Sequence, residues 1–491
     1  MPTIILLYLL LTAGSPPRPT VAITPPLATN GDESWLGLAL ADSLTTRLLI
    51  HSRYDPKTLE RVYPLNVFGW RQALAAARGE GIDVTALDAK SAGALGQQLG
   101  ADAVFKGSYT VRGKEVTLSW ALVGDKKTQA VLPLTLDAIG PAVETLARAV
   151  LDAVGQDSKS AGGHKMEPLP LAAYKPFGQA LEIVGQQSLD PRAQLVLPEP
   201  EIRRALALLS AATDAGPTFV RAWVERGIAN AMLGEERAAE DALVQAMAQA
   251  GEFDPPTALG LYYLYDRQHK VDEALNVMQE ASSTHLGFLQ GLGYLGEGYA
   301  RAGRYHEAVQ VLSTFVARVP KSPWAQLRRA AALARLGKHD LAIADTKAVL
   351  ARFPDSLAIL TALASRQIDA RQYDAARASL LQVLARKPGL PSALTRLSYL
   401  ELEQNRPAEA LKLAEQAVQA LGDGRGESLA GYAQLNLGHA LALAGRTTEA
   451  LAAVAKAQKL GIGAEDLGHL LRDPRLKDFL NDPRCPIRVV H

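Results

Sequence analysis

A 34-residue spacing between alanines is the feature that most constrains the fold of this chain. Prolines follow three of these alanines by twelve residues, at Pro320, Pro354 and Pro388. Such a period in a helix-favouring sequence is typical of stacked helix pairs, and because such stacks present surfaces, we predict binding rather than catalysis. The alanines recur at intervals of 35, 34, 34, 34, 34 and 40 residues: Ala239, Ala274, Ala308, Ala342, Ala376, Ala410 and Ala450.

The composition fits a folded chain of several units. The chain has 491 residues, of which 48% are hydrophobic and 21% are charged. This is too long for one ordinary core and too apolar for a disordered tail. The net charge of +1 argues against nucleic acid or an anionic membrane as the main partner. A single cysteine, Cys485, excludes an intramolecular disulfide and a cysteine-based metal cluster.

An apolar run from Ile4 to Leu11 lies near the N-terminus. It is shorter than the ~20 residues that span a bilayer, but it has the length of a signal-peptide core, although no Lys or Arg precedes it. Two alternatives stay open: the remnant of a membrane helix of a longer protein, and a plain N-terminal segment. We therefore treat residues 1–19 as a signal peptide or apolar segment. We expect a periplasmic or cell-envelope protein, with the cytoplasm as the alternative, and membrane contact only through this segment if it is not cleaved.

Residues 20–155 do not follow the period and are predicted to form a small α+β domain. A short strand is expected at 21–23, ending at two prolines. Two longer strands, at 103–111 and 116–123, should form a hairpin around a turn, with a last strand near 130–136. Helices are expected over residues 33–51, 67–78, 88–100 and 141–154.

Two stretches of this region carry a family resemblance. One is Val21-Ala22-Ile23-Thr24-Pro25, followed by Gly31-Asp32, and the other runs from Leu95 to Tyr109. With the helix between them, they resemble the TolB amino-terminal-like domain over residues 20–137. Pro26 stands where that family usually has an aromatic residue, and the last strand lacks the usual Gly and Trp. The resemblance implies no catalytic residue. It also implies a position in front of tetratricopeptide repeats in bacterial signalling or envelope proteins.

Helical texture follows a predicted linker, residues 156–170, which is rich in Gly, Ser and Pro. About eight helix pairs are expected over 171–463, the first one atypical, and a capping helix and tail over 464–491. The predicted fold class is therefore an α+β N-terminal domain plus an all-α tetratricopeptide superhelical solenoid, and we expect the two parts to fold independently. The pairs resemble tetratricopeptide repeats through small or aromatic residues at first-helix positions: Trp223, Gly227, Gly296, Tyr299 and Gly438.

Several enzyme-like motifs have a plainer interpretation. Gly291-Leu292-Gly293-Tyr294-Leu295-Gly296 matches a dinucleotide fingerprint, which requires a preceding strand. Here it falls in the first helix of a repeat, so we interpret it as helix packing. His306-Glu307 lacks the second histidine that a zinc protease needs. The sequence has neither a nucleophile elbow nor a Walker loop, and we predict no catalytic residue, cofactor or metal.

The candidate binding residues lie on the first helices, which face the groove in this repeat type. Arg267, Arg301 and Arg335 are spaced by one repeat and should form a ladder. Arginine suits carboxylates and tyrosine adds stacking area, so an acidic or carboxylate-terminated protein or peptide is the expected partner. In the alternative interpretation, the three arginines end their helices, where a cation meets the helix dipole without any partner. The further candidates are Arg328, Arg396, Tyr263, Tyr294, Tyr399, Asn436 and His439.

The leading functional hypothesis is a non-enzymatic scaffold of the bacterial cell envelope that binds a partner segment in the groove of its repeats. The rival is a sensory or regulatory module of a signalling protein whose catalytic or DNA-binding part is missing. A third idea, an accessory subunit of an enzyme, rests on the repeats alone.

Overall fold

The computed structural model describes residues 18–30, 33–50, 53–55, 60–62, 65–79, 81–124, 128–156, 158, 169–185, 197–250, 254–286, 288–422, 427–463, 467–471 and 473–485. The predicted signal segment up to residue 17 and most of the predicted linker lie outside these residues. The chain divides into two compact units, Met1–Ala332 and Leu333–His491. The division falls within helix α14 (Pro323–Arg335). No helix of the described part is both long and apolar enough to cross a bilayer.

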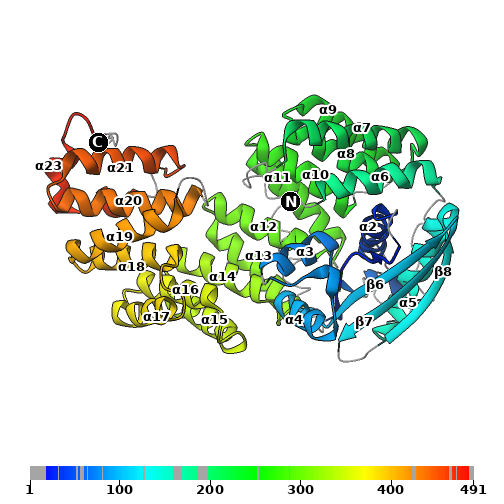
Figure 1. Cartoon of the computed structure of the whole chain (residues 1–491), viewed down its shortest axis with the longest axis horizontal. Coiled ribbons are helices and arrows are strands. Elements are labelled where there is room, and N and C mark those ends of the chain that lie inside the picture. The colour runs from blue at the N-terminus through cyan, green and yellow to red at the C-terminus, as the bar shows by residue number, and fades with distance from the viewer. Residues whose placement is uncertain are drawn as a thin grey trace. The chain divides into compact units, whose positions relative to one another are not determined.

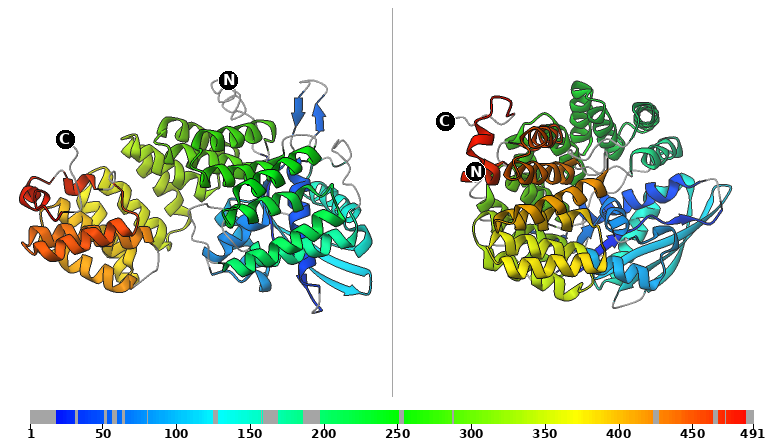
Figure 2. Two further views of the ribbon diagram at one scale, coloured as in Figure 1. Left: turned by 90° about the horizontal axis from the view of Figure 1, so that it is seen from above. Right: turned by 60° about the vertical axis from the view of Figure 1, so that its left-hand side comes forward.

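The N-terminal domain is built on one mixed sheet in the order β5-β1-β6-β7-β8, with β2 paired to β6. Strand β1 runs parallel to β5 and β6, whereas β6, β7 and β8 are antiparallel. A separate two-stranded ribbon, β3 with β4, stands apart from this sheet (Figure 2). The strands are β1 (Thr20–Ile23), β2 (Leu27–Ala28), β3 (Arg53–Asp55), β4 (Glu60–Val62), β5 (Asn66–Phe68), β6 (Ala103–Arg112), β7 (Glu115–Gly124) and β8 (Thr128–Thr135).

Four α-helices pack on this sheet. Helix α2 lies against α5 and β5, while α4 lies against β6 and β7. Helix α4 begins and ends where the sequence predicts. Asp88 accepts a hydrogen bond from the Ser91 backbone N–H at 2.7 Å, and Gly100 ends the helix at φ +75°. The helices are α2 (Trp35–Ile50), α3 (Trp70–Gly79), α4 (Ala89–Leu99) and α5 (Ile139–Ala153).

The predicted helix over 67–78 is wrong at its start. Asn66–Phe68 forms strand β5, and α3 begins only at Trp70. The β-type residues Val67 and Phe68 are buried beside β1, and Gly69 separates this strand from the helix. Tertiary pairing therefore overrides the helical pattern at this point.

Sixteen helices of the described part form eight consecutive pairs after the N-terminal domain (Figure 1). In unit 1 they are α6 (Leu171–Val184), α7 (Glu199–Ala215), α8 (Val220–Met232), α9 (Glu236–Ala250), α10 (Pro255–Arg267), α11 (Val271–Thr284), α12 (Leu289–Arg301) and α13 (Tyr305–Arg318). Beyond α14, unit 2 holds α15 (His339–Arg352), α16 (Leu357–Asp369), α17 (Tyr373–Arg386), α18 (Pro391–Glu403), α19 (Pro407–Leu421), α20 (Glu427–Leu443) and α21 (Thr447–Lys459). Short helical turns follow: α22 (Gly468–Leu471), η4 (Pro474–Leu476) and α23 (Lys477–Leu480).

The alanines of the 34-residue period lie where helices of a pair meet. Ala239, Ala308, Ala342, Ala376 and Ala410 are fully buried on the second helices. Small first-helix residues face them: a Cβ added to Gly296 would stand 2.6 Å from Leu312 Cγ on α13. The close approach of backbones that the period predicts is therefore present.

The N-terminal domain and the first repeats share one compact unit. Arg221 on α8 donates to both carboxylate oxygens of Asp42 on α2, at 2.7 and 2.8 Å. Arg71 on α3 pairs with buried Glu225 at 2.8 Å. These contacts join the N-terminal domain to the first repeats, and the compact units divide at residues 332 and 333 rather than in the predicted linker. Independent folding of the N-terminal domain stays a prediction.

Candidate functional site

A polar cavity of about 950 Å³ lies in unit 2 among the C-terminal ends of the first helices. It is lined by residues of α14, α16, α18 and α20, by the turns that follow three of these helices, and by residues 473–475. Three sequence-predicted residues reach it: Arg335, Tyr399 and His439. We call this space the unit 2 cavity.

Acids and tyrosines form one wall of the unit 2 cavity. The carboxylate of Glu403 accepts hydrogen bonds from Tyr399 and Tyr373, and Asp369 lies close enough to Tyr399 to act on its hydroxyl. Burial raises the pKa of Tyr399, and the charge of Glu403 raises it further. Asp369 pairs with Arg366 at 3.1 Å, whereas no ion pair joins Glu403 to a Lys or Arg among the described residues. We call Tyr373, Tyr399 and Glu403 the acid–tyrosine cluster.

Arginines from three successive first helices come close together in unit 2. Burial lowers the pKa of Arg366, and the charge of Arg335 lowers it further while Asp369 opposes the shift. Burial and the charge of Arg366 likewise lower the pKa of Arg396. Arg396 is held by the Ser365 hydroxyl and by the Ser392 carbonyl at 3.3 Å. The part of the first-helix face of unit 2 that carries these arginines therefore favours anions.

The turns between the two helices of a pair carry an unusual set of residues. One position in this turn has positive φ in every pair from α8 to α21, and glycine fills it at Gly234, Gly303, Gly337 and Gly445. His269, Arg371 and Asn405 occupy the same position at φ +58°. A non-glycine residue there costs on the order of 1 kcal/mol. All three line cavities, Arg371 and Asn405 in unit 2 and His269 in unit 1.

The C-terminal segment closes one end of the unit 2 cavity. Asp473 accepts from His439 Nε2 at 2.8 Å and from the Arg475 backbone N–H at 3.0 Å, and Arg475 also bonds Asn405. His439 is 3% exposed, and burial lowers its pKa although Asp473 opposes the shift. Asn436 is likewise buried and donates to the Thr395 carbonyl at 2.8 Å. His439 and Asn436 are thus buried residues that stabilise the first-helix face of unit 2.

In unit 1, the ladder arginines contact residues of the chain itself. Arg301 pairs with Asp266 of the preceding repeat at 2.8 Å and bonds the Tyr262 hydroxyl. Arg267 lies over the ring of Tyr263, 5.8 Å from its centroid, and Tyr263 is 4% exposed. Both arginines line a cavity of about 430 Å³. The Arg301 contacts join neighbouring repeats, whereas the Arg267–Tyr263 contact stays within α10. Both arginines are the last residues of their helices, as the interpretation without a partner expects.

The remaining two candidates of unit 1 also lie in intramolecular contacts. Arg328 pairs with Glu297 of α12 and lies over the ring of Trp324, 4.5 Å from its centroid. Tyr294 packs on Tyr262 with ring centroids 5.3 Å apart. Both side chains are half-buried, so each offers only part of its surface to a partner.

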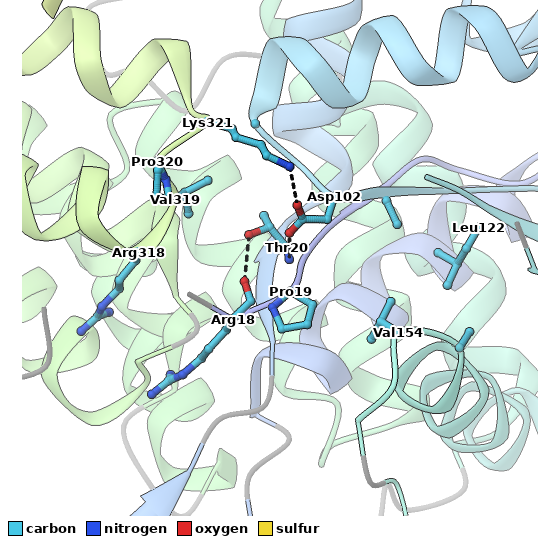
Figure 3. A pocket seen from close by; sticks show the side chains of 13 residues that line it. Arg18, Pro19, Thr20, Asp102, Leu122, Val154, Arg318, Val319, Pro320 and Lys321 are labelled. Carbon is cyan, nitrogen blue, oxygen red and sulfur yellow. Dashed lines mark hydrogen bonds and ion pairs between the residues drawn. The ribbon is translucent and has the colours of Figure 1, made fainter. Parts of the chain in front are cut away.

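A further cavity of unit 1, about 450 Å³, lies where the sheet meets the turn between α13 and α14 (Figure 3). Asp102 joins two sides of the cavity's rim. It accepts one hydrogen bond from the Thr20 N–H at 3.0 Å and another from Lys321 Nζ at 3.2 Å. Arg18 and Arg318 also line the cavity, together with apolar residues such as Leu122 and Val154. Because Asp102 and Lys321 bind each other, we interpret this cavity as part of the junction.

The enzyme-like motifs are explained by packing. Gly291–Gly296 lies inside α12, and a Cβ on Gly293 would stand 2.2 Å from the Trp324 ring. The dinucleotide mechanism needs these glycines in a turn after a strand, so the fingerprint is a helix-packing motif. Within the described residues, no group of three His, Cys, Asp or Glu is placed to hold a metal ion.

Comparison with known proteins identifies the repeats. Residues 201–255, 294–356 and 361–425 match a family model described as tetratricopeptide repeat. The C-terminal region therefore consists of tetratricopeptide repeats, as the 34-residue period predicts. The matched model indicates no enzyme family. No curated protein sequence matches the chain.

Solved structures resemble the chain in fold alone. A tetratricopeptide repeat protein from Parabacteroides merdae is 15% identical, with a TM-score of 0.41 over 54% of this chain and 99% of its own. A thermophilic tetratricopeptide repeat protein from Thermus thermophilus is 23% identical, with a TM-score of 0.32 over 37% and 99%. MamA from Desulfovibrio magneticus is 18% identical, with a TM-score of 0.30 over 33% and 92%. At these TM-scores we draw no argument from them.

Sequence reasoning missed the acids of the unit 2 cavity. Asp369 and Glu403 follow Arg335 by 34 and 68 residues, so they occupy the same register as the arginine ladder. The 34-residue spacing of these acids was visible in the sequence, but only arginines were considered at this position of the repeat. The contribution of residues 473–475 carried no such signal, because they lie outside the repeat period.

Proposed function

We propose that this protein is a non-enzymatic scaffold whose tetratricopeptide repeats bind a segment of a partner protein at the first-helix face of unit 2. The unit 2 cavity carries this proposal. It is open, polar and as large as a ligand pocket. Two of the cavity's residues, Arg371 and Asn405, stand at turn positions that glycine fills elsewhere. Strain retained at a cavity favours a binding role over a purely structural one.

The partner's chemistry follows from the arginines. Arg335, Arg366 and Arg396 supply guanidinium groups along one side of the face. Arginine binds carboxylates through two parallel hydrogen bonds, so an acidic or carboxylate-terminated segment fits this side. In this proposal the partner is a protein or peptide, not nucleic acid. Arg366 also pairs with Asp369 at 3.1 Å, and in unit 1 Arg301 and Arg328 pair with Asp266 and Glu297.

We further infer that the N-terminal domain is TolB-like and that the protein works in the bacterial periplasm or cell envelope. The strand–helix order of the domain and the Leu95–Tyr109 stretch support the first inference. The apolar run before residue 12 supports the second. A tightly joined N-terminal domain would hold the repeats in place while they bind.

Site-specific photo-crosslinking in the native cell tests the binding face. A photoreactive phenylalanine replaces exposed Tyr432 on α20, near Arg396, and in a matched control it replaces exposed Leu381 on second helix α17. We expect one dominant adduct from position 432 and none from 381. Equal adducts from both positions would show that the first-helix face is not the binding surface. Fractionation of the adduct tests the envelope location.

A further inference from the structure

The unit 2 cavity is lined by two residues of opposite charge that take part in no ion pair with another described residue, Glu403 and Arg371. No ion pair joins Glu403 to a described Lys or Arg, and none joins Arg371 to another described residue. Two charged neighbours are paired within the chain: Asp369 with Arg366 at 3.1 Å, and Arg475 with Asp473. Unused charges of both signs in one open cavity indicate a ligand with both signs.

The acid–tyrosine cluster is built to receive a cation. Tyr373 lies at the start of α17, and Tyr399 and Glu403 lie one helical turn apart on α18. Both tyrosines donate to the Glu403 carboxylate, which fixes the two hydroxyl groups beside a negative charge. Aromatic faces attract ammonium and guanidinium groups, and an adjacent carboxylate strengthens the attraction. The cluster therefore fits a Lys or Arg side chain.

Arg371 supplies the complementary site. It stands at φ +58° in the turn between α16 and α17, two residues before Tyr373, and it is exposed. Gly337 holds the equivalent position one repeat earlier without that strain. A side chain retained there at a cost in stability points to a use in binding. Its guanidinium suits a carboxylate beside the bound cation.

We propose that the unit 2 cavity binds a partner segment in which a basic side chain and a carboxylate are neighbours, the cation entering the acid–tyrosine cluster and the carboxylate meeting Arg371. This rests on the proposed function, because it names the segment that the repeats bind. It differs from a purely acidic partner, which the carboxylate of Glu403 would repel.

Selection from a displayed library of random heptapeptides tests this inference. The full-length protein is the bait, and the tightest peptide is then measured by fluorescence anisotropy. We expect the selected peptides to carry Lys or Arg next to Asp, Glu or a free C-terminus. Glu403→Gln keeps an acceptor for the tyrosines but removes the charge, and it should weaken binding about tenfold. Glu449→Gln, an exposed acid on α21 away from the cavity, is the matched control and should change nothing.

Charge reversal gives the decisive comparison. Glu403→Lys should abolish binding of the basic peptide, and changing the peptide's basic residue to Glu should restore it. Glu403 is exposed, so circular dichroism should show all variants folded. Peptides that bind without a basic residue, or whose affinity ignores Glu403, would overturn this inference and leave the binding function standing. A library that yields no binder would contradict the proposed function and this inference together.

Discussion

Arg221 of the second helix pair binds Asp42 of the N-terminal domain through two parallel hydrogen bonds of 2.7 and 2.8 Å. Both groups are buried, and Trp70 and Glu225 complete the network at 3.0 and 2.7 Å. Burial raises the pKa of Asp42, but Arg221, Trp70 and Arg71 together lower it, so the net shift is downward. The carboxylate is therefore ionised and paired at neutral pH. This network joins the N-terminal domain to the first repeats within unit 1.

Removing one partner of this pair should destabilise unit 1 strongly. Arg221→Ala leaves Asp42 and Glu225 buried without their cation, and we expect a loss of about 3–5 kcal/mol. The measurement is denaturant unfolding of the full chain. Arg203→Ala removes an exposed pair with Glu199 and should cost less than about 1 kcal/mol. If Arg221→Ala released a still-folded N-terminal domain without affecting the repeats, the single-unit description would be wrong.

Two helical glycines should respond to alanine in opposite directions. In Gly296→Ala the new methyl carbon would stand 2.6 Å from Leu312 Cγ, so we expect a loss of roughly 1–3 kcal/mol by overpacking. Gly93 on α4 has nothing within 4 Å of an added Cβ, so Gly93→Ala should stabilise by about 0.5–1 kcal/mol. Thermal unfolding of both variants shows whether each substitution stabilises or destabilises the protein. A stabilising Gly296→Ala would contradict the close helix pairing.

Substitutions at the turn position with positive φ should also change the free energy of unfolding in opposite directions. Arg371→Gly removes a strained residue and should stabilise unit 2 by up to about 1 kcal/mol. Gly337→Ala introduces the same strain one repeat earlier and should destabilise by a similar amount. Differential scanning calorimetry compares the two. If Arg371→Gly lowered the melting temperature, Arg371 would have a structural role that outweighs its strain.

The burial of His439 makes unit 2 sensitive to pH. Its pKa is lowered in the folded state, so the neutral form stabilises the fold above the unfolded pKa of about 6.5, and this stability is lost as pH falls through the lower folded pKa. His439→Gln removes the titration and retains a donor for Asp473. The loss of stability between pH 7 and pH 5 should therefore be larger in the wild type than in this variant. If the free energy of unfolding changed with pH in the same way in the wild type and the variant, His439 would be excluded as the titrating group.

Sequence patterns predicted the parts of the fold that depend on local spacing. The buried alanines, the packing glycines and the capped helix from Asp88 to Gly100 all follow from periodicity and capping chemistry. Strand β5 was missed because its pairing with β1 is a long-range contact. The Asp42–Arg221 pair joins residues 179 apart, and no local pattern connects them.

The candidate site was predictable only in part, for a similar reason. Helical spacing placed Arg335 and Tyr399 on one face, and both line the unit 2 cavity. Spacing does not reveal which charges the fold neutralises, so the pairing of Arg301 with Asp266 and of Arg328 with Glu297 appears only in the structure. The strained conformation of Arg371 is equally invisible in a sequence.

Hydrogen exchange of the full chain with and without the tightest selected peptide tests the central claim most directly, because it locates the bound segment. We predict protection of residues 335–339, 369–373 and 403–405, which include the turns lining the unit 2 cavity, and unchanged exchange over the rest of the second helices, residues 340–352, 374–386 and 407–421. Protection confined to the second helices, or to the N-terminal sheet, would contradict the claim that the first-helix face of unit 2 is the binding surface.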